Sequence, residues 1–445
     1  MNAGSTAGAD DSTSRSAPTR AIGRSAVAWA FYDWANSAFA VTVLVAFFPL
    51  MLKRYWAAGA DATVTTLQLG SANAIGSIVI AVLAPALGAI ADQSASRKRY
   101  LLAFTVLAIL NTACLALIGR GEWQLAVAAF VLASIGFAGS ASFYDALLVN
   151  VADPRQYHRV SALGYALGYL GGGLLFAVNV AMTLKPQWFG LADATMAVRV
   201  SFAMVAVWWA VFTVPLMLYV HEPPRTAPSA SWSSVAIAGI RQLAGTFHEI
   251  RRLRHVMLFL FAYWLYIDGV DTIARMAIDY GMALGFAESD LIVALLITQF
   301  VAFPAALAYG YLGSRIGAKR AIAIGIAVYA GVTLWGHSMH SVREFYGLAV
   351  VIGLVQGGVQ SLSRSLFARL IPASRSAEFF GFYNMLGKFA AIIGPLLMGV
   401  TAVLTGSSRS AILAVLVLFA AGGLLLLFVD EEEGAAVAQA LDSRR

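Results

Sequence analysis

The chain has 445 residues, of which 60% are hydrophobic and only 12% are charged. Soluble domains usually carry about a quarter charged residues, and a single soluble core stops growing near roughly 250–300 residues. The composition therefore excludes an ordinary soluble protein and indicates a membrane protein. The net charge of +7 comes from basic residues strung between apolar segments, which is typical of an orientation signal and argues against a nucleic-acid surface.

In chain order, a polar tail is followed by membrane spans. Residues 1–24 are rich in serine, threonine, alanine and glycine and lack the apolar stretch of a signal peptide, so we expect a disordered cytoplasmic tail. A helix that crosses about 30 Å of hydrocarbon needs roughly 20 mainly apolar residues. This window predicts spans at 27–51, 69–91, 100–119, 124–149, 161–183, 198–220, 255–280, 290–313, 320–338, 345–370, 379–404 and 409–429.

A polar stretch divides the predicted spans into two bundles, over 25–220 and 255–430. The stretch, 221–254, is Ser-rich and basic, and we expect a cytoplasmic linker in which Ser233 to Arg254 form an interfacial helix. The predicted fold class is an all-α polytopic membrane protein. It has about twelve transmembrane helices in two pseudo-symmetric six-helix bundles.

Lysine and arginine in the short loops set the orientation, because cytoplasmic loops carry an excess of both. With the N-terminus inside, the cytoplasmic loops and linker hold Arg97, Lys98, Arg99, Arg155, Arg159, Arg225, Arg241, Arg251, Arg252, Arg254, Arg315, Lys319, Arg320, Arg369 and Arg375. The opposite side receives only Lys53, Arg54, Arg120, Lys185, Arg199, Arg343 and Arg409. We expect both termini in the cytoplasm, with a solvated tail over 431–445 after the acidic run Asp430 to Glu433. The location would be the plasma (inner) membrane in a bacterium.

The two predicted bundles repeat each other. A glycine, an acidic position and a basic run follow the second span, and paired polar residues recur in the first and seventh spans. After the second span, Gly88, Asp92 and Arg97–Arg99 correspond to Gly310, Ser314 and Arg315–Arg320 after the eighth. In the first span, Asp33, Asn36 and Ser37 correspond to Asp268, Asp271 and Thr272 in the seventh. Parallel halves of this kind suit a transporter whose site lies between them.

The loop from Gly88 to Arg99 resembles the signature of the major facilitator superfamily, Gly-x-x-x-Asp followed by basic residues. Tyr32-Asp33-Trp34-Ala35-Asn36-Ser37-Ala38-Phe39 resembles the first-helix signature of the branch that contains the autophagy-related vacuolar amino-acid effluxers and their bacterial relatives. The loop departs from the pattern at Gln93, and its second copy has Ser314 at the acidic position. The resemblance covers residues 24–430. It implies the major facilitator fold, and the branch points to amino acids as substrates.

Several ionisable residues fall inside the predicted spans, where each costs at least about 2.5–3.5 kcal/mol unless it faces a cavity or a partner. They are Asp33, Asp145, Asp268, Asp271, Arg275, Arg364 and Lys388, with Asp279 near the outer boundary. Nearly all lie on spans one, four, seven and ten, which line the central cavity in the superfamily that the chain resembles. Helical spacing places Gln356, Gln360 and Arg364 on one face. We interpret such faces as cavity lining, with helix–helix packing as the alternative.

The polar residues fall into two predicted roles. The candidate substrate- or proton-binding residues are Asp33, Asn36, Asp268, Asp271, Gln360 and Arg364. Asp145 is expected to pair with Arg364 or Lys388 and close the inner gate. The resemblance gives Gly88, Asp92, Arg97 and Arg315 a conformational role, in which Asp92 bonds to a helix terminus of the other half.

Two glycine features and several aromatic residues allow more than one interpretation. Gly164-x-x-x-Gly168-Tyr169 in span five resembles a motif associated with antiporters, with Tyr169 where proline is usual, but such spacing also serves close helix packing. Gly394-Pro395 predicts a kink in span eleven. The aromatic residues that could stack on a substrate, or merely pack the core, are Tyr144, Tyr165, Tyr263, Trp264, Tyr266 and Tyr383.

We expect a secondary transporter that moves a small polar solute by alternating access. Opposite charges in the cavity suit an amino acid or related zwitterion, and proton-coupled export is one version of this hypothesis. The alternatives are an efflux carrier for drugs or amphipathic metabolites, which would have a larger aromatic and weakly charged cavity, and a non-transporting receptor or scaffold.

An enzyme is not expected, because the sequence shows no nucleophile–base set or metal ligands at one depth in the membrane. A glycine-rich phosphate loop with Lys-Ser/Thr is also missing, so this chain is not expected to use ATP. We expect no cofactor, no metal and no nucleic acid. The expected partners are the lipid bilayer, a small-molecule substrate and protons, with a monomer as the default state.

Overall fold

The computed structural model describes residues 22–60, 62–94, 97–222 and 253–443. The elements of the N-terminal half are α1 (Arg24–Ala38), the π-helix η1 (Phe39–Phe47), α2 (Phe48–Met51), η2 (Leu52–Trp56), α3 (Ala62–Ser94), α4 (Arg97–Leu115), α5 (Trp123–Ala146), α6 (Leu148–Val151), η3 (Pro154–Gln156), α7 (Tyr157–Leu184), η4 (Pro186–Phe189) and α8 (Ala194–Tyr219). The predicted interfacial helix from Ser233 to Arg254 and the predicted tail over 1–24 lie largely outside the described residues.

The elements of the C-terminal half are also helical. They are α10 (Arg254–Ala283), α11 (Glu288–Ile316), α12 (Ala318–Ser338), α13 (Val342–Leu370), η5 (Ala373–Arg375), α14 (Ser376–Thr405), α15 (Ser408–Ile412), α16 (Val415–Leu427) and α17 (Glu431–Ser443). In the described ranges, 11 helical segments are long and apolar enough to cross a membrane. The 30-residue α14 holds a further apolar stretch at Ile393–Thr405. The prediction of about twelve membrane helices is therefore confirmed.

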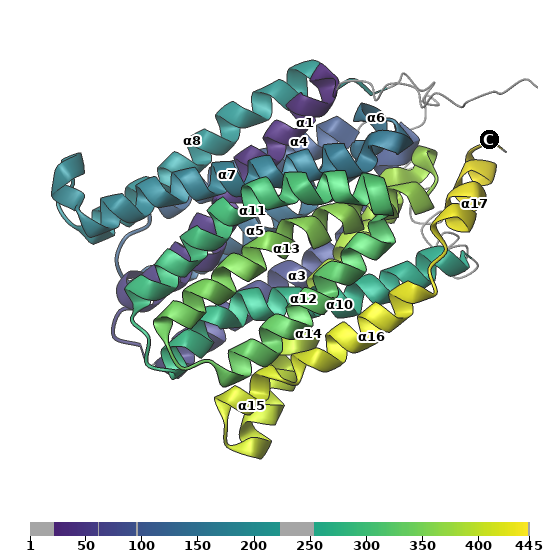
Figure 1. The fold of residues 1–445 in the computed structure, drawn as a ribbon. Helices are drawn as coiled ribbons and strands as arrows, with labels where there is room; N and C mark the ends of the chain where they lie inside the picture. The colour runs from purple at the N-terminus through teal and green to yellow at the C-terminus, as the bar shows by residue number, and fades with distance from the viewer. Residues whose placement is uncertain (1–21, 61, 95–96, 223–252, 444–445) are drawn as a thin grey trace, which may run out of the picture.

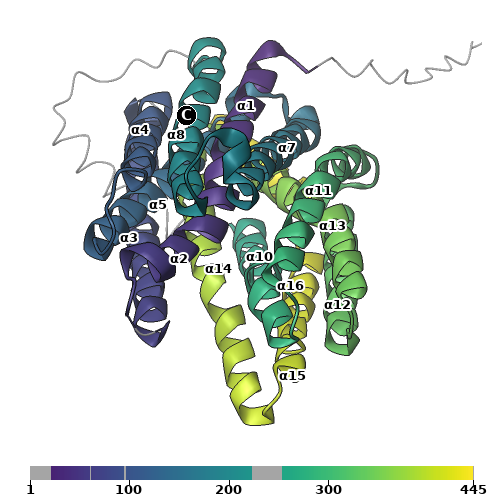
Figure 2. The same cartoon turned by 90° about the vertical axis from the view of Figure 1, so that its left-hand side faces the viewer.

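The helices form two bundles that lie side by side, with α1, α4, α5 and α8 in one and α10, α12, α13 and α16 in the other (Figure 2). Within the first bundle α4 packs on α5 and α1 packs on α7 and α8, and within the second α13 packs on α11 and α12. The bundles meet mainly where α3 packs on α14 and where α7 packs on α11. Thus the second helix of each half rests on the fifth helix of the other, as a pseudo-twofold arrangement requires.

Two glycines at repeat-related positions allow these crossings to be close. A Cβ on Gly88 of α3 would overlap the backbone carbonyl of Ala377 at the start of α14. A Cβ on Gly310 of α11 would overlap the side chain of Ala162 on α7. Since neither a backbone carbonyl nor an alanine Cβ can rotate aside, both positions require glycine for the close approach.

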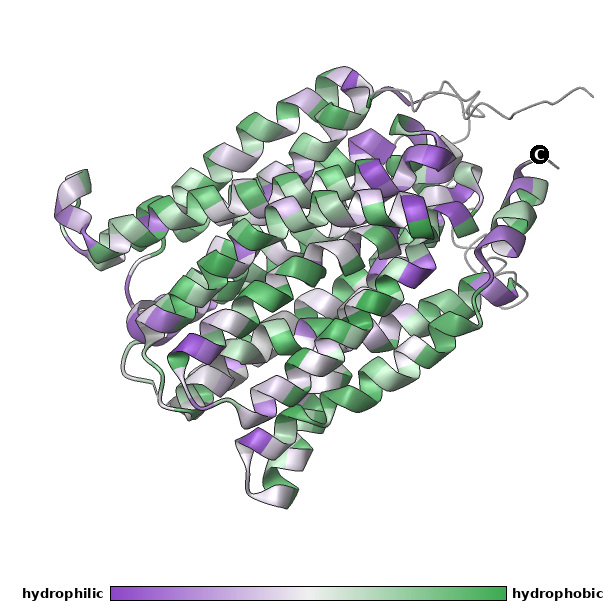
Figure 3. Cartoon of the chain, viewed as in Figure 1, coloured by the Kyte–Doolittle hydropathy of each residue, from purple (hydrophilic) through white to green (hydrophobic). Residues whose placement is uncertain are grey.

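The described chain begins and ends at one end of the molecule, at the upper right of Figure 1. We call this the termini end and the opposite one the far end. Hydrophilic residues gather towards the termini end, while apolar residues cover the middle of the helices (Figure 3). Exposed apolar side chains such as Val207 on α8 and Leu424 on α16 face outward from the bundles, as helices in lipid require.

Residues after the last span form the helix α17, which packs on α13; the prediction of a solvated tail did not anticipate this helix, although Glu432 and Glu433 are exposed. Glu431 forms an ion pair with Arg369 at the end of α13. Asp442 accepts hydrogen bonds from the backbone N–H groups of Ala373 (2.7 Å) and Ser374 (3.2 Å). Burial raises the pKa of the Glu431 carboxyl, and Arg369 opposes that rise. The acidic residues are ordered because cationic and N–H groups at this end give them partners.

Replacing Gly88 with alanine should destabilise the protein, because the added methyl group forces α3 and α14 apart. Overpacking of this kind costs typically about 1–3 kcal/mol. Thermal unfolding in detergent would measure the change. Gly70→Ala on the same helix is the matched control, since a Cβ at Gly70 meets no atom within 4 Å. Equal melting temperatures for the two variants would contradict the proposed crossing.

Candidate functional site

Arg364 on α13 joins the two halves through a buried ion cluster. Its side chain is 2% exposed. The guanidinium donates hydrogen bonds to Asp33 of α1 at 3.2 Å and to Asp145 of α5 at 3.1 Å. It also donates to the hydroxyl and the backbone carbonyl of Ser161 on α7, both at 2.9 Å. One cation from the C-terminal half therefore holds three helices of the N-terminal half.

Aromatic rings surround the guanidinium on the N-terminal side. The centre of the Arg364 guanidinium lies 4.3 Å from the centroid of Tyr165, 4.8 Å from that of Trp29 and 5.3 Å from that of Tyr144. Cation–π contacts of this kind are worth about 0.5–2 kcal/mol or more when desolvated. One of these rings also holds a carboxylate, since the Tyr144 hydroxyl donates to Asp33 Oδ2 at 2.8 Å.

The space for this cluster comes from a glycine in the motif of span five. A Cβ on Gly164 of α7 would lie 2.6 Å from Asp33 Oδ2 and 2.9 Å from Arg364 Nη2. Farther along α7, a Cβ on Gly168 would lie 2.6 Å from the Ser37 hydroxyl oxygen. The glycine motif therefore acts as a close contact between α7 and α1, and it lets a charged cluster form where any larger residue would block it.

A second contact between the halves lies at the N-terminus of α14. Asp92, which is 3% exposed, accepts hydrogen bonds from the backbone N–H groups of Ala377 (3.2 Å) and Glu378 (2.9 Å). A carboxylate is stabilised at a helix N-terminus by the free N–H groups and the helix dipole. Arg97 holds the same carboxylate at 2.6 Å and donates to the carbonyl of Ala373 at 3.2 Å. Asp92 and Arg97 of the N-terminal half thus bind backbone groups at and just before the start of α14 in the C-terminal half.

Several smaller contacts close the termini end around the ion cluster. The Ser161 hydroxyl donates to the Ser361 carbonyl at 2.7 Å. His158 on α7 lies 2.8 Å from the Ser365 hydroxyl on α13, and the Ser376 hydroxyl donates to the Ala146 carbonyl at 3.0 Å. All of these bonds join one half to the other. Among the described residues, these contacts therefore hold the two halves together at the termini end.

Towards the far end lies a cavity of about 190 Å³ that is lined mainly by the C-terminal half, with Val41, Val45 and Tyr169 from the N-terminal half. Its walls are mostly apolar and come from both halves, with Val41 and Val45 on one side and residues such as Ile273 and Ile352 on the other. The residues with polar side chains in the lining are Tyr169, Tyr280, Thr298, Gln299 and Gln356. The Arg364 cluster and the other contacts between the halves lie between this cavity and the termini end.

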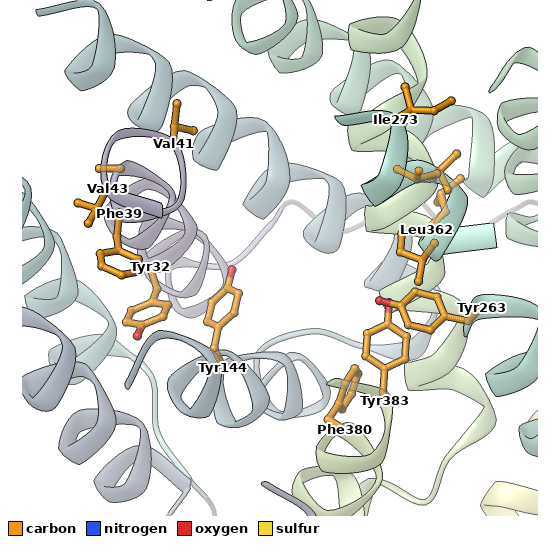
Figure 4. Close-up of a cluster of buried hydrophobic side chains, with 14 of the residues drawn as sticks. Tyr32, Phe39, Val41, Val43, Tyr144, Tyr263, Ile273, Leu362, Phe380 and Tyr383 are labelled. Carbon is orange, nitrogen blue, oxygen red and sulfur yellow. The ribbon is translucent and has the colours of Figure 1, made fainter. Parts of the chain in front are cut away.

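Stacked tyrosines of the C-terminal half lie across from Tyr144 of the N-terminal half. The rings of Tyr263 and Tyr383 are 4.1 Å apart at their centroids, and both residues are buried. Figure 4 shows this pair opposite Tyr144, which lies on the N-terminal half. Asp271 is close enough to interact electrostatically with Tyr165 and with Tyr263.

The structure places Asp268 and Arg315 away from the ion cluster. Asp268 is fully buried against α14, where its carboxylate accepts from the N–H of Gly394 at 3.0 and 3.1 Å. Asn36 is buried at 5% exposure. Arg315 is exposed and stacks on Tyr311 of its own helix at 4.9 Å. The side chains of Lys388, Arg275 and Asp279 lie outside the described part of the structure.

Sequence reasoning missed three contributors to the cluster. Ser161 binds Arg364 through both its hydroxyl and its carbonyl, Asn384 donates to Asp145 Oδ2 at 3.0 Å, and Trp29 stacks on the guanidinium. None of the three is ionisable, so the cost of charge in the membrane gave no signal for them. The prediction gave Asp33 a binding role and Asp145 a gating role. The structure instead pairs both carboxylates with the same cation, Arg364.

Known proteins resemble this chain along most of its length. The family model described as "Vacuole effluxer Atg22 like" matches residues 71–155 and 149–439. The uncharacterised MFS-type transporter YxiO of Bacillus subtilis is 39% identical over 413 residues, which are 92% of this chain and 96% of YxiO. Autophagy-related protein 22 of Yarrowia lipolytica is 27% identical over 314 residues. That match covers 64% of this chain, which spans about half (52%) of the Yarrowia protein.

Solved structures of carriers share the fold at low sequence identity. The human organic anion transporter MFSD10 has a TM-score of 0.68 at 16% identity, covering 91% of this chain and 99% of its own. FucP in its outward conformation has a TM-score of 0.68 at 12% identity, covering 92% of this chain and 98% of its own. At these identities the likeness extends to the fold alone.

Replacing Arg364 with leucine should destabilise the protein by about 3–5 kcal/mol, because the change leaves buried carboxylates without their cation. Arg364→Lys keeps the charge but cannot reach Asp33, Asp145 and Ser161 together, so it should recover only part of the loss. Thermal unfolding in detergent measures both variants. Arg315→Leu is the control for loss of an exposed arginine. A wild-type melting temperature for Arg364→Leu would contradict the cluster's role.

Proposed function

Because this chain belongs to the Atg22-like family of major facilitator transporters, we propose that it moves a small polar solute, an amino acid or related zwitterion, by alternating access. The observation that carries the proposal is the Arg364 cluster, which joins the halves at one end while a cavity lies towards the other. Alternating access needs such a reversible closure between two rigid halves. The ion pairs meet that need. A buried charge that has lost its partner is costly, so states in which the pairs are only partly separated are disfavoured.

The termini end faces the cytoplasm in this proposal. Basic residues are concentrated in the loops at that end, including Arg97, Arg155 and Lys319, and the positive-inside rule puts such loops in the cytoplasm. Lys98 and Lys319 add to this picture, because each donates to carbonyl oxygens at the end of the last helix of its own half. The described conformation is then closed to the cytoplasm, with its cavity on the opposite side of the membrane. In a bacterium that membrane would be the inner one.

The charges in the cluster support proton coupling. The described contacts join two carboxylates, Asp33 and Asp145, to one guanidinium. A buried site with an excess negative charge is costly, and one bound proton removes the excess. The proposal assigns this proton to Asp33 or Asp145, which accept further hydrogen bonds from Tyr144 and Asn384, respectively. Opening the gate would release Arg364 for a substrate carboxylate and Asp33 for a substrate ammonium group.

The lining of the cavity favours a second candidate function, the export of amphipathic metabolites. The walls are mostly apolar, and Asp33 and Arg364 are not among the lining residues. A solute that enters from the far end would therefore meet apolar and amide groups before it meets a charge. This order suits a solute with an apolar body and a small polar head.

Replacing Asp33 or Asp268 with asparagine should abolish flux driven by a pH gradient, because each change removes a buried group that can carry a proton. Counterflow exchange at equal pH should continue in Asp268→Asn. In Asp33→Asn it should need a higher substrate concentration, because this change also removes the proposed partner of the substrate ammonium group. Reconstituted liposomes with an imposed gradient would measure both activities, and Asp153→Asn, at an exposed position, is the control. Driven flux at the wild-type rate in both variants would rule out the coupling.

Uptake of labelled amino acids, compared with that of lipophilic cations, separates the two candidate functions. Saturable counterflow of an amino acid, lost in Arg364→Leu, supports the first. Counterflow confined to lipophilic cations supports the second and excludes the first.

A further inference from the structure

Tyr169 and Gln360 form a hydrogen bond between the halves at the boundary of the cavity. The Tyr169 hydroxyl on α7 donates to Gln360 Oε1 on α13 at 2.7 Å. Tyr169 lines the cavity, whereas Tyr165, one helical turn before it, lies over the Arg364 guanidinium. On α13 the order is the same, since Gln356 lines the cavity and Arg364 forms the ion cluster, with Gln360 one turn from each.

A glycine on α13 leaves room for the Tyr169 ring. A Cβ on Gly357 of α13 would lie 2.9 Å from Tyr169 Cε2, so the glycine leaves room for the ring against the helix of the other half. Tyr169 is also the residue at which the glycine motif of span five departs from the antiporter pattern that it resembles. A phenol at this place supplies a hydrogen-bond donor that proline cannot supply.

We propose that the bond between Tyr169 and Gln360 is a substrate-sensing latch, opened when the polar head of the solute replaces the tyrosine hydroxyl on Gln360. This inference rests on the proposed function and adds a requirement on the substrate. A solute that only fills the apolar cavity leaves the latch closed and acts as a blocker. A solute with a hydrogen-bond donor at its leading end breaks the latch, and the Arg364 cluster one turn away then opens.

The latch can be tested first without any ligand, by the distance across the termini end. Spin labels at Arg155→Cys and Ser314→Cys, both exposed positions on opposite halves, in a Cys114→Ser background would report opening of that end. One lost hydrogen bond of ordinary strength should raise the population with a long distance about fivefold in Tyr169→Phe and in Gln360→Leu. The double variant should match the single ones, because both remove the same bond.

Tyr280→Phe is the matched control. Tyr280 lines the same cavity, but its hydroxyl donates to the Gly336 carbonyl within the C-terminal half, at 2.8 Å. This variant should keep the wild-type distances. A Tyr169→Phe distribution equal to that of Tyr280→Phe, or effects of the two latch variants that add in the double variant, would overturn the proposal. If Gln360→Leu does not fold, the comparison of the two Tyr→Phe variants still decides.

A second measurement adds amino acids that stabilise the wild-type protein in a thermal-shift screen. Such a ligand should increase the long-distance population in wild type and in Tyr169→Phe but not in Gln360→Leu, which lacks the amide that the ligand binds. An equal ligand response in Gln360→Leu would overturn the sensing role. Failure of every amino acid to stabilise the protein would count against the proposed substrate, and the ligand-free comparison would still decide the latch.

Discussion

The cost of placing charge inside a membrane determines how the two halves of this protein meet. Asp33 and Asp145 can be buried together because the Arg364 guanidinium pairs with both carboxylates, and the three residues come from different helices and from both halves. Closure of the termini end is therefore needed to pair these charges. Any movement that separates the halves must supply new partners from water, a substrate or a proton.

The second contact, at Asp92, uses backbone dipoles of the other half in addition to its side-chain partner Arg97. The carboxylate binds free N–H groups at the start of α14, and Gly88 lets the two helices approach closely enough for that bond. Together the two contacts act at different points of the same interface. The Arg364 cluster lies between α13 and three helices of the other half, and the Asp92 contact links α3 to α14. In the proposed mechanism the carrier closes by pairing these charges and opens when they exchange partners.

Much of the fold could be predicted from the sequence, because span length and hydropathy are set by the bilayer. The predicted spans agree with the helices to within several residues, and the family suggested by Tyr32–Phe39 and by the loop from Gly88 to Arg99 is confirmed. The cost of buried charge also pointed to Asp33, Asp145 and Arg364. Periodicity along single helices cannot show which faces meet, so the sequence did not reveal that Asp33 and Asp145 share one cation or that Asp268 turns to Gly394. The docking of α17 was missed for the same reason, since its acidic residues depend on partners such as Arg369 that are distant in the chain.

The central claim is that pairing of Arg364 with Asp145 and Asp33 closes the termini end. A charge exchange tests it most directly, with the distance between labels on Arg155→Cys and Ser314→Cys measured in Asp145→Arg, in Arg364→Asp and in the protein that carries both changes. The account predicts that each single change lengthens the distance, because like charges then face each other, and that the double change restores most of the short-distance population. Wild-type distances in both single variants would contradict it.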